Sequence, residues 1–198
     1  MERYPYDNGV RRAMIETLSN RMESSRKRRK KMNKILVTFA TRAGSTYEVA
    51  ARVAEVLRAG GAAVEVKPVM AVHEVKDYDA VVVGSAIRMG NFLPEAVAFV
   101  KTNRETLSRI PTAYFLVSGL LRNDTPETRR QVLAFLDPVR ALHEPVSIGL
   151  FAGRLDYSTI GGFDRSIAEA VSSAGGDWRN WEAIDEWAHN LQSVLAHV

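Results

Sequence analysis

Apolar and polar positions after residue 33 follow two patterns in turn, and together they predict alternating strands and helices. Short and almost entirely apolar runs are typical of strands buried on both faces of a sheet. Between these runs, apolar residues recur at helical spacing, as Val49, Val53 and Leu57 do before Gly60. The runs predict strands at 35–40, 63–68, 80–85, 112–118 and 146–151, and the helical segments predict helices at 46–59, 94–108, 126–142 and 181–196.

This alternation predicts the fold class. Strands separated by helices pair in parallel, since a parallel connection needs a crossover segment. The chain shows no internal repeat that would indicate another architecture. Right-handed crossovers between five parallel strands then favour an α/β three-layer sandwich with the strand order 2-1-3-4-5. Ligands of such a sheet gather at the carboxyl ends of the strands, beside the switch between the first and third strands.

Composition limits what the chain can do. A chain of 198 residues with 46% hydrophobic content can form one sizeable core, but it is too short for two ordinary domains. The absence of cysteine excludes disulfides, thiolate-held iron–sulfur clusters and cysteine catalysis. The four histidines show no metal-ligand spacing, so we expect no metal site. No apolar run approaches a membrane span and no secretory signal is apparent, so we expect a cytoplasmic location.

Charge separates a basic arm, residues 1–33, from a domain at 34–198. The arm carries ten Lys and Arg against four Asp and Glu, whereas the remainder carries 17 against 19. Apolar residues recur every four positions from Val10 to Met22, and 26–31 is an uninterrupted cationic run. We expect a helical or disordered arm. It could contact the inner face of a membrane peripherally or bind nucleic acid, or it could be a solvated extension ahead of a start at Met32.

A hydroxyl-rich loop follows the first predicted strand and opens the next helix. Its hydroxyls, one glycine and the free N–H groups of a helix N-terminus form an anion-binding arrangement without a lysine. The loop satisfies neither the Walker pattern nor the dinucleotide fingerprint. An ordinary hydroxyl-capped helix remains the structural alternative. The candidate phosphate-binding residues are Thr41, Arg42, Ala43, Gly44, Ser45 and Thr46.

Two further loops should meet the phosphate loop at the same edge of the sheet. Both leave buried strands with small residues and a glycine, so that their backbones can lie against a flat ring and supply amide hydrogen bonds. The loop after the third strand offers Ser85, Ala86, Ile87, Arg88, Met89 and Gly90, and the loop after the fourth offers Ser118, Gly119, Leu120, Arg122 and Asn123.

Three segments carry a resemblance to a known family. The phosphate loop resembles the T-x-T-G-x-T loop of flavodoxins, with Ala43 in place of a threonine. Residues 78–90, YDAVVVGSAIRMG, look like the flavin-ring loop of the flavodoxin-like family that includes menaquinone-dependent protoporphyrinogen oxidase. Residues 176–181, GDWRNW, are similar to its closing motif, and the match covers roughly residues 34–191.

The resemblance implies noncovalent FMN, with its phosphate at residues 41–46 and its isoalloxazine between the other two loops. It identifies no catalytic side chain. Arg88 and Arg122 could stabilise a reduced anionic flavin or meet an acidic substrate, or they could simply be solvated. The nearest bulky residues to the ring would be Ile87, Met89, Leu120 and Leu121, so we expect a less covered ring than in small flavodoxins.

Two functional classes remain open. The first is an FMN oxidoreductase that oxidises a porphyrinogen-like or other small reduced substrate with a quinone as acceptor. The second is a flavodoxin-type electron carrier, which would present an acidic rim to a basic partner. A long insert at 153–180, with an apolar helical face at Phe163, Ile167 and Val171 that we expect to pack on the protein itself, favours the enzyme. Nucleic-acid binding is not expected, because the domain offers no basic surface.

Overall fold

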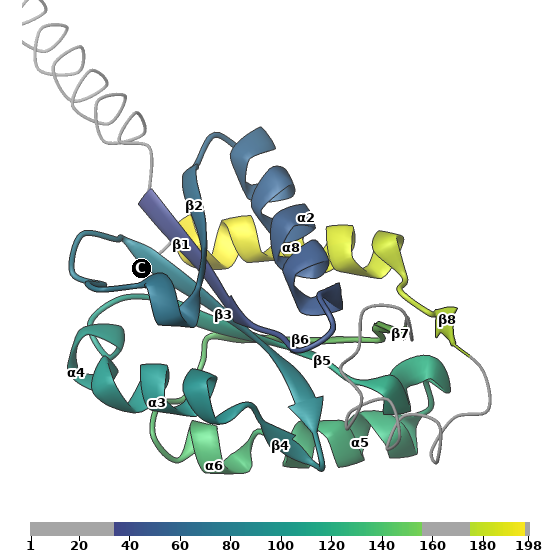
Figure 1. The fold of residues 1–198 in the computed structure, drawn as a ribbon. Coiled ribbons are helices and arrows are strands. Elements are labelled where there is room, and N and C mark those ends of the chain that lie inside the picture. Colours follow the sequence, from purple (N-terminus) through teal and green to yellow (C-terminus); the bar gives the residue numbers. More distant parts are fainter. Residues whose placement is uncertain (1–33, 156–174, 197–198) are drawn as a thin grey trace, which may run out of the picture. The chain divides into compact units, whose positions relative to one another are not determined.

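The computed structural model describes residues 34–155 and 175–196 (Figure 1). The basic arm lies outside the described residues, and so does the helical face predicted at Phe163, Ile167 and Val171. Within the described part, no helix is long and apolar enough to cross a bilayer.

The centre of the domain is a parallel sheet whose strand order is the predicted one. Its strands pair in the order β2-β1-β3-β5-β6, which corresponds to 2-1-3-4-5 in the numbering of the five predicted strands. The in-register neighbours Val37 and Val82 on adjacent strands show why the sheet forms, since both are completely buried. The strands are β1 (Lys34–Ala40), β2 (Ala63–Pro68), β3 (Ala80–Arg88), β5 (Thr112–Val117) and β6 (Ser147–Phe151).

Helices cover both faces of this sheet (Figure 1). Successive residues of a strand point to opposite faces, so Leu36 belongs to one core cluster and Val37 to the other. The cluster of Val37 includes α2 (Ser45–Ala59) and α8 (Trp181–Ala196), and that of Leu36 includes α3 (Pro94–Thr102), α4 (Arg104–Leu107), α5 (Pro126–Ala134) and α6 (Asp137–Arg140).

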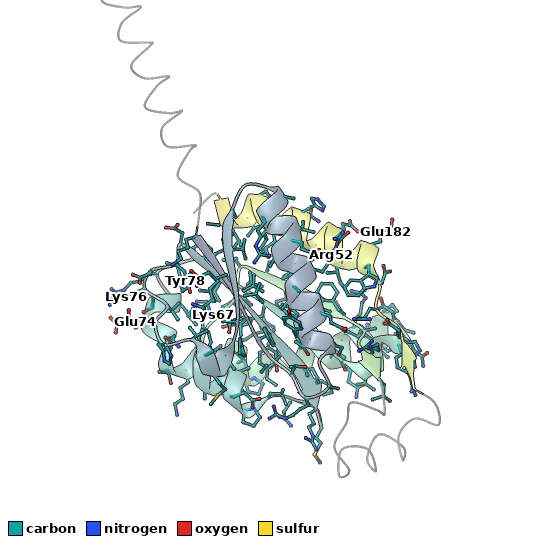
Figure 2. The ribbon with its side chains drawn as sticks, turned by 45° about the horizontal axis from the view of Figure 1, so that its top comes forward. Arg52, Lys67, Glu74, Lys76, Tyr78 and Glu182 are labelled. Atoms are coloured by element: carbon teal, nitrogen blue, oxygen red, sulfur yellow. The ribbon has the colours of Figure 1, made fainter. Side chains whose placement is uncertain are left out.

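Ion pairs and hydrogen bonds on the surface link elements that are separated in the sequence, and Figure 2 labels two of the residues involved, Arg52 and Tyr78. Arg52 of α2 makes two hydrogen bonds of 2.6 Å to Asp185 of α8. Glu65 of β2 binds Lys67 and accepts a 2.7 Å hydrogen bond from the Tyr78 hydroxyl. These contacts fix α2 against α8 and the edge strand against the segment before β3.

Two predicted helices are broken in the structure. The helix predicted at 94–108 is divided at Asn103, whose side-chain amide donates to the carbonyl of Phe99 at 2.9 Å. The helix predicted at 126–142 is divided between α5 and α6. Pro138 explains the second break, because a proline has no N–H to donate to Ala134, four residues earlier, and its ring would clash with that carbonyl.

Three short strands and two 3₁₀ turns were not predicted. β3 runs three residues past its predicted end and turns back into β4 (Asn91–Phe92), with Arg88 opposite Asn91. A second antiparallel pair joins the two ends of the insert, with Arg154 opposite Asp177. These strands are β7 (Arg154–Leu155) and β8 (Gly176–Asp177), and the 3₁₀ turns are η1 (Val69–Ala71) and η2 (Gly119–Arg122).

Candidate functional site

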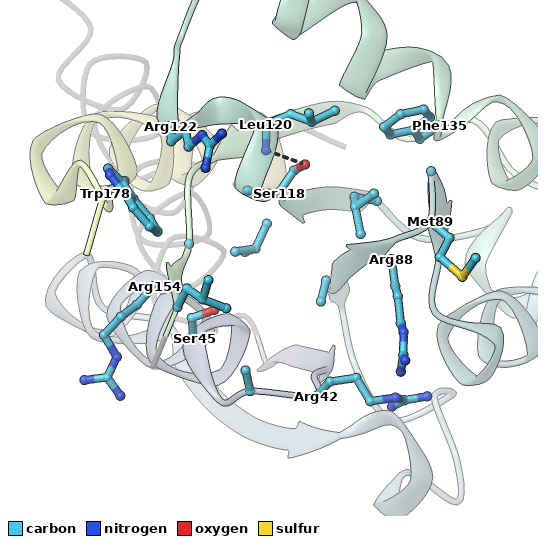
Figure 3. A pocket seen from close by; sticks show the side chains of 18 of the residues that line it. Arg42, Ser45, Arg88, Met89, Ser118, Leu120, Arg122, Phe135, Arg154 and Trp178 are labelled. Atoms are coloured by element: carbon cyan, nitrogen blue, oxygen red, sulfur yellow. Dashed lines mark hydrogen bonds between the residues drawn. The ribbon is translucent and has the colours of Figure 1, made fainter. Parts of the chain in front are cut away.

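The loops after β1, β3 and β5 line one cavity of about 690 Å³, called the main cavity below (Figure 3). The three segments meet because the carboxyl ends of parallel strands lie at one edge of the sheet. The main cavity is lined by these predicted residues: Thr41, Arg42, Ala43, Ser45, Ala86, Ile87, Arg88, Met89, Gly90, Ser118, Gly119, Leu120, Arg122 and Asn123.

Three predicted residues do not line the main cavity. The Ser85 side chain is completely buried, donates to the carbonyl of Ala86 at 2.8 Å and accepts from the Leu93 amide at 3.0 Å. Ser85 therefore fixes the start of α3 rather than facing a ligand. Gly44 is the N-cap of α2, and Thr46 is buried in its first turn.

The candidate phosphate loop is held in shape by its own residues and by α3. Thr41 Oγ1 accepts a 3.0 Å hydrogen bond from the Gly44 amide, and Gly44 has a φ of 86°, a left-handed conformation that glycine adopts without strain. Arg42 pairs with Glu95 in the first turn of α3 through both guanidinium Nη atoms, one of them at 3.0 Å. The hydrogen bond from Arg42 lowers the pKa of Glu95.

The second loop is the β3–β4 hairpin rather than an irregular loop. Met89 and Gly90 form its turn with φ values of 49° and 74°, and type I′ turns require positive φ at both central residues. Asn91 Nδ2 donates to the Met89 carbonyl at 2.8 Å. The Met89 side chain is 83% exposed although it lines the main cavity. The hairpin therefore presents a flexible apolar side chain at the edge of this cavity.

A face of α5 completes the side of the main cavity beyond η2. Thr128, Gln131 and Phe135 line it, and sequence reasoning missed all three. Their spacing of three and four residues places them on one helical face directly after the third loop, which is the signal that could have found them. The aromatic ring of Phe135 also packs against Gly90, where an added Cβ would lie 3.2 Å from it.

The two ends of the insert form the remaining wall, which includes Gly153, Arg154, Leu155 and Trp178. The Trp178 amide donates to the Gly153 carbonyl at 3.2 Å, which joins the two ends. Of the four bulky residues expected nearest the ring, Ile87, Met89 and Leu120 line the main cavity, whereas Leu121 is buried in the core. The main cavity also has two aromatic side chains that were not predicted, Trp178 and Phe135. Trp178 comes from the closing motif that the sequence did show.

Comparison with known proteins decides the family. The family model of the flavodoxin domain matches residues 36–180. The chain belongs to the flavodoxin domain family. This membership implies a flavin cofactor, in agreement with the fold and with the position of the main cavity at the switch between β1 and β3.

Relatives of this flavodoxin-domain protein include enzymes. It is 29% identical over 175 residues to protoporphyrinogen IX dehydrogenase (quinone) of Escherichia coli strain K12, an alignment that covers 83% of this chain and 96% of the relative. A protein of the same name from Leishmania major is 27% identical over 134 residues, covering 62% of this chain and 57% of that protein. Both names describe an oxidoreductase, which supports the prediction of an enzyme.

Solved structures support the fold alone. A short-chain flavodoxin associated with a bacterial microcompartment superposes with a TM-score of 0.54 at 15% identity, covering 81% of this chain and 97% of that protein. At this identity the similarity confirms the three-layer flavodoxin fold and says nothing of the ligand.

The main cavity and the first turn of α2 beside it together fit a flavin nucleotide. Among the described residues, Thr46 Oγ1 is the one buried side-chain polar atom without a hydrogen-bond partner, and it lies in the first turn of α2. The amides of Ser45 and Thr46 open that 15-residue helix, whereas those of Tyr47 and Glu48 already donate to the Gly44 carbonyl. A phosphate there would satisfy both the Thr46 hydroxyl and the two leading amides. Trp178 and Phe135 offer aromatic surface for a flat ring.

An ionic network fixes the wall formed by the insert. The Arg179 side chain is only 7% exposed and binds Asp177 through Nε at 2.7 Å and Nη2 at 2.5 Å. Arg179 also pairs with Glu48 of α2, which Arg154 approaches at 3.5 Å. The Asp177 hydrogen bond, followed by the charge of Glu48, raises the pKa of Arg179, whereas the same hydrogen bond lowers the pKa of Asp177.

The charged side chains that line the main cavity are all basic among the described residues. Its lining contains four arginines, Arg42, Arg88, Arg122 and Arg154, and no carboxylate or imidazole among the residues that the structure describes. Nor does the described part of the chain bring together three or more residues of metal-binding type. The formal charges on the lining are therefore all positive, and two of them, those of Arg42 and Arg154, face Glu95 and Glu48, which lie outside the lining.

Proposed function

We propose that this protein binds FMN in the main cavity and oxidises a porphyrinogen-like reduced small molecule, passing the electrons to a quinone. The alignment with the Escherichia coli relative supports this proposal because it extends over nearly the whole of that protein. In each turnover the substrate would lose a pair of electrons with their protons, and the quinone would become a quinol. Bound FMN supplies the two-electron acceptor that no amino-acid side chain provides.

The observation that carries the proposal is the charge around the main cavity. An electron carrier attracts a basic protein partner through an acidic rim around its flavin. Here the described lining is cationic and contains no carboxylate. That arrangement suits an acidic small molecule, and a porphyrinogen carries propionate groups. The same arrangement disfavours the electron-carrier alternative.

The residues of the cavity would act mainly by binding and by excluding water. The first turn of α2, with the hydroxyls of Thr41, Ser45 and Thr46, would hold the phosphate. Trp178 and Phe135 would cover the ring and lower the local dielectric constant, which strengthens the field of nearby cations. Arg88 and Arg122 would compensate negative charge on the substrate or on the reduced ring. We assign no general base, because no described lining residue is a carboxylate or an imidazole.

The proposal is tested on the full-length protein loaded with FMN. After the released cofactor has been identified, the protein is mixed anaerobically with protoporphyrinogen IX. We expect the visible flavin absorbance to bleach while porphyrin fluorescence appears, and addition of a soluble naphthoquinone to restore the flavin absorbance.

A different pattern would overturn the proposal. If protoporphyrinogen IX leaves the flavin oxidised, while a flavodoxin reductase reduces it and a protein acceptor reoxidises it, the chain is an electron carrier. If no flavin binds even in excess, the protein lacks the electron acceptor that the proposed reaction requires.

A further inference from the structure

A second cavity lies on the other side of the β3–β4 hairpin, between this hairpin and α3; we call it the side groove. Its volume is about 720 Å³. It shares Arg42, Arg88 and Met89 with the main cavity, so the two cavities meet at the hairpin turn. Its lining consists of Arg42, Arg88, Met89, Asn91, Phe92, Leu93, Pro94, Val97, Ala98 and Lys101.

The side groove combines an apolar floor with cationic groups. Phe92 and Leu93 are 3% and 2% exposed and form part of the core, so the floor is rigid. Arg88 enters from the hairpin, and Lys101 lies in the last turn of α3. No described lining residue is a carboxylate, although residues 34–198 contain more Asp and Glu than Lys and Arg. The local excess of positive charge is therefore not an average property of the domain surface.

The turn between the two cavities is also unusual. Met89 adopts a positive φ of 49°, a conformation that is less favourable for methionine than for glycine, which has no Cβ, or for asparagine, whose short polar side chain can form local hydrogen bonds. Its side chain is 83% exposed and lines both cavities. A flexible and polarizable thioether in this place suits contact with an apolar ligand that crosses from one cavity to the other.

We infer that the side groove binds the carboxylate-bearing edge of the substrate. The occupant is a largely apolar ring system with acidic side chains, whose reacting part lies in the main cavity and whose carboxylates reach Arg88 and Lys101. The inference rests on the proposed function and adds the recognition element for the acidic groups. Figure 3 shows the Arg88 side chain running from the hairpin toward the Arg42 loop, at the junction where such a ligand would pass.

The basic residues of the side groove differ in their surroundings from those near the candidate phosphate loop. Arg42 is engaged by Glu95, and Arg154 lies 3.5 Å from Glu48, so each faces a carboxylate of the protein itself. The FMN phosphate is expected at the first turn of α2. Lys101 lines the side groove but not the main cavity, so its removal should affect substrate and not cofactor.

Binding of a stable porphyrin tests the inference without turnover. The FMN-loaded full-length protein is titrated with mesoporphyrin IX and with its dimethyl ester, with porphyrin fluorescence as the signal. We expect the acid to bind at least about fivefold more tightly than the ester, and this preference to weaken as ionic strength rises. We expect Lys101→Gln to weaken binding of the acid by about threefold to tenfold and to leave the ester unchanged.

Lys76→Gln is the matched control, because Lys76 is an exposed lysine that pairs with Glu74 in the segment leading into the start of β3. It should change binding of neither porphyrin. FMN affinity is measured for each variant, and we expect it to stay at the wild-type value in Lys101→Gln. Arg88→Gln provides a second variant from the opposite wall of the side groove, and it too should reduce the preference for the acid.

The outcomes separate this inference from the proposed function. Equal binding of acid and ester, or a preference that survives in both variants, overturns the inference even if protoporphyrinogen IX is oxidised. A preference lost in both variants supports the side groove as a carboxylate site even if protoporphyrinogen IX is not a substrate. Preferential binding of an uncharged quinone in the side groove, competing with the porphyrin, would also overturn it.

Discussion

Arg179 and Glu48 form an ion pair that joins the far end of the insert to the first turn of α2. The Arg179 side chain is 7% exposed and also holds Asp177, so three charges meet next to the helix expected to bind the flavin phosphate. Glu48 is an acidic residue close to that helix N-terminus, and its neutralisation by Arg179 favours a bound anion. The closing motif of the chain thus contributes charge next to the first turn of α2.

We predict that Arg179→Gln destabilises the protein by about 1–3 kcal/mol, because two carboxylates lose a nearly buried partner. Urea unfolding of the flavin-free protein measures this change. The variant should also lose affinity for FMN, while its affinity for riboflavin, which lacks the phosphate, should change less. A uniform loss for both flavins would contradict the electrostatic role.

The control for Arg179 is Arg129→Gln. Arg129 pairs with Asp124 through two hydrogen bonds of 2.6 Å, but both side chains are about half exposed. Exposed ion pairs contribute little, so this variant should lose less than about 1 kcal/mol and keep its affinity for both flavins.

Thr46→Val tests the unpaired hydroxyl in the first turn of α2. Without ligand, a buried hydroxyl that has no partner costs stability, so valine should stabilise the flavin-free protein by up to about 1 kcal/mol. With FMN, the variant should lose a hydrogen bond to the phosphate. We therefore expect this single substitution to raise the free energy of unfolding of the flavin-free protein and to weaken FMN binding. Urea unfolding measures the first change and flavin fluorescence measures the second.

Thr38→Val is its matched control. Thr38 is equally buried, but its hydroxyl donates to the Lys67 carbonyl at 2.9 Å. This variant should lose about 1 kcal/mol of stability and keep its intrinsic FMN affinity. Unchanged FMN binding by Thr46→Val would remove Thr46 from the phosphate site.

Gly153→Ala should distort the wall of the main cavity. An added Cβ would lie 2.9 Å from Val117 Cγ1 and 3.2 Å from Ser45 Oγ, so the segment between β6 and β7 would have to move away from β5 and α2. Overpacking of this kind costs about 1–3 kcal/mol. We expect loss of thermal stability together with weaker flavin binding, since Ser45 lines the same cavity.

Gly119→Ala provides the comparison, because an added Cβ at Gly119 meets nothing within 4 Å although Gly119 lines the same cavity. Its stability should stay within about 0.5 kcal/mol of wild type. Equal effects of the two substitutions would show that crowding at Gly153 is not the cause.

Met89→Asn should separate stability from ligand binding at the hairpin turn. Asparagine tolerates positive φ and favours this turn, so the free energy of unfolding should rise by roughly 0.5–1 kcal/mol. Porphyrin binding should weaken at the same time, because the apolar contact is lost. Met70→Asn, at a methionine that is 78% exposed and has no positive φ, should give neither effect.

Acid should weaken the contact between α6 and the sheet through His143. Its Nε2 lies 3.0 Å from the Leu107 carbonyl and its Nδ1 lies 3.1 Å from the buried Tyr114 hydroxyl. Burial lowers the pKa of His143 below 6.5, so the unfolded chain takes up a proton more readily than the folded one. Stability is therefore present above pH 6.5 and is lost as pH falls from 6.5 through the folded pKa.

Urea unfolding at several pH values checks this sign. His143→Gln should flatten the dependence below pH 6.5. A stability that rises on acidification through this range would contradict the prediction.

The strands of the sheet could be predicted because each one is encoded by a short run of apolar residues. Apolar runs such as AVVVGS at 80–85 need burial on both faces, and the crossover rule restricts how parallel strands can be ordered. The same rule brought the three loops to one edge, so most of the candidate residues line the main cavity. The break between α5 and α6 was not predicted, although Pro138 is the signal that could have shown it, because a proline within a helical pattern interrupts the helix.

Other features depended on distance in space. The hairpin after β3 has Met-Gly where a sequence signal would show Asn-Gly, so its turn was not apparent. The buried Ser85 hydroxyl accepts a hydrogen bond from the Leu93 amide, eight residues away, in addition to donating to the carbonyl of the next residue. Trp178 reaches the main cavity only because β7 and β8 pair across the insert.

Hydrophobic period and helix-terminus chemistry act within a few residues, so the fold class, the strand order and a candidate phosphate loop could be predicted from the chain alone. The charges and aromatic rings around the main cavity depend instead on tertiary packing. Arg88, Arg154 and Trp178 come from three separate segments, and their convergence depends on how each segment packs. Packing between distant segments leaves no periodic signal in the chain. The basic and aromatic residues that line the main cavity together could therefore be identified only from the folded structure.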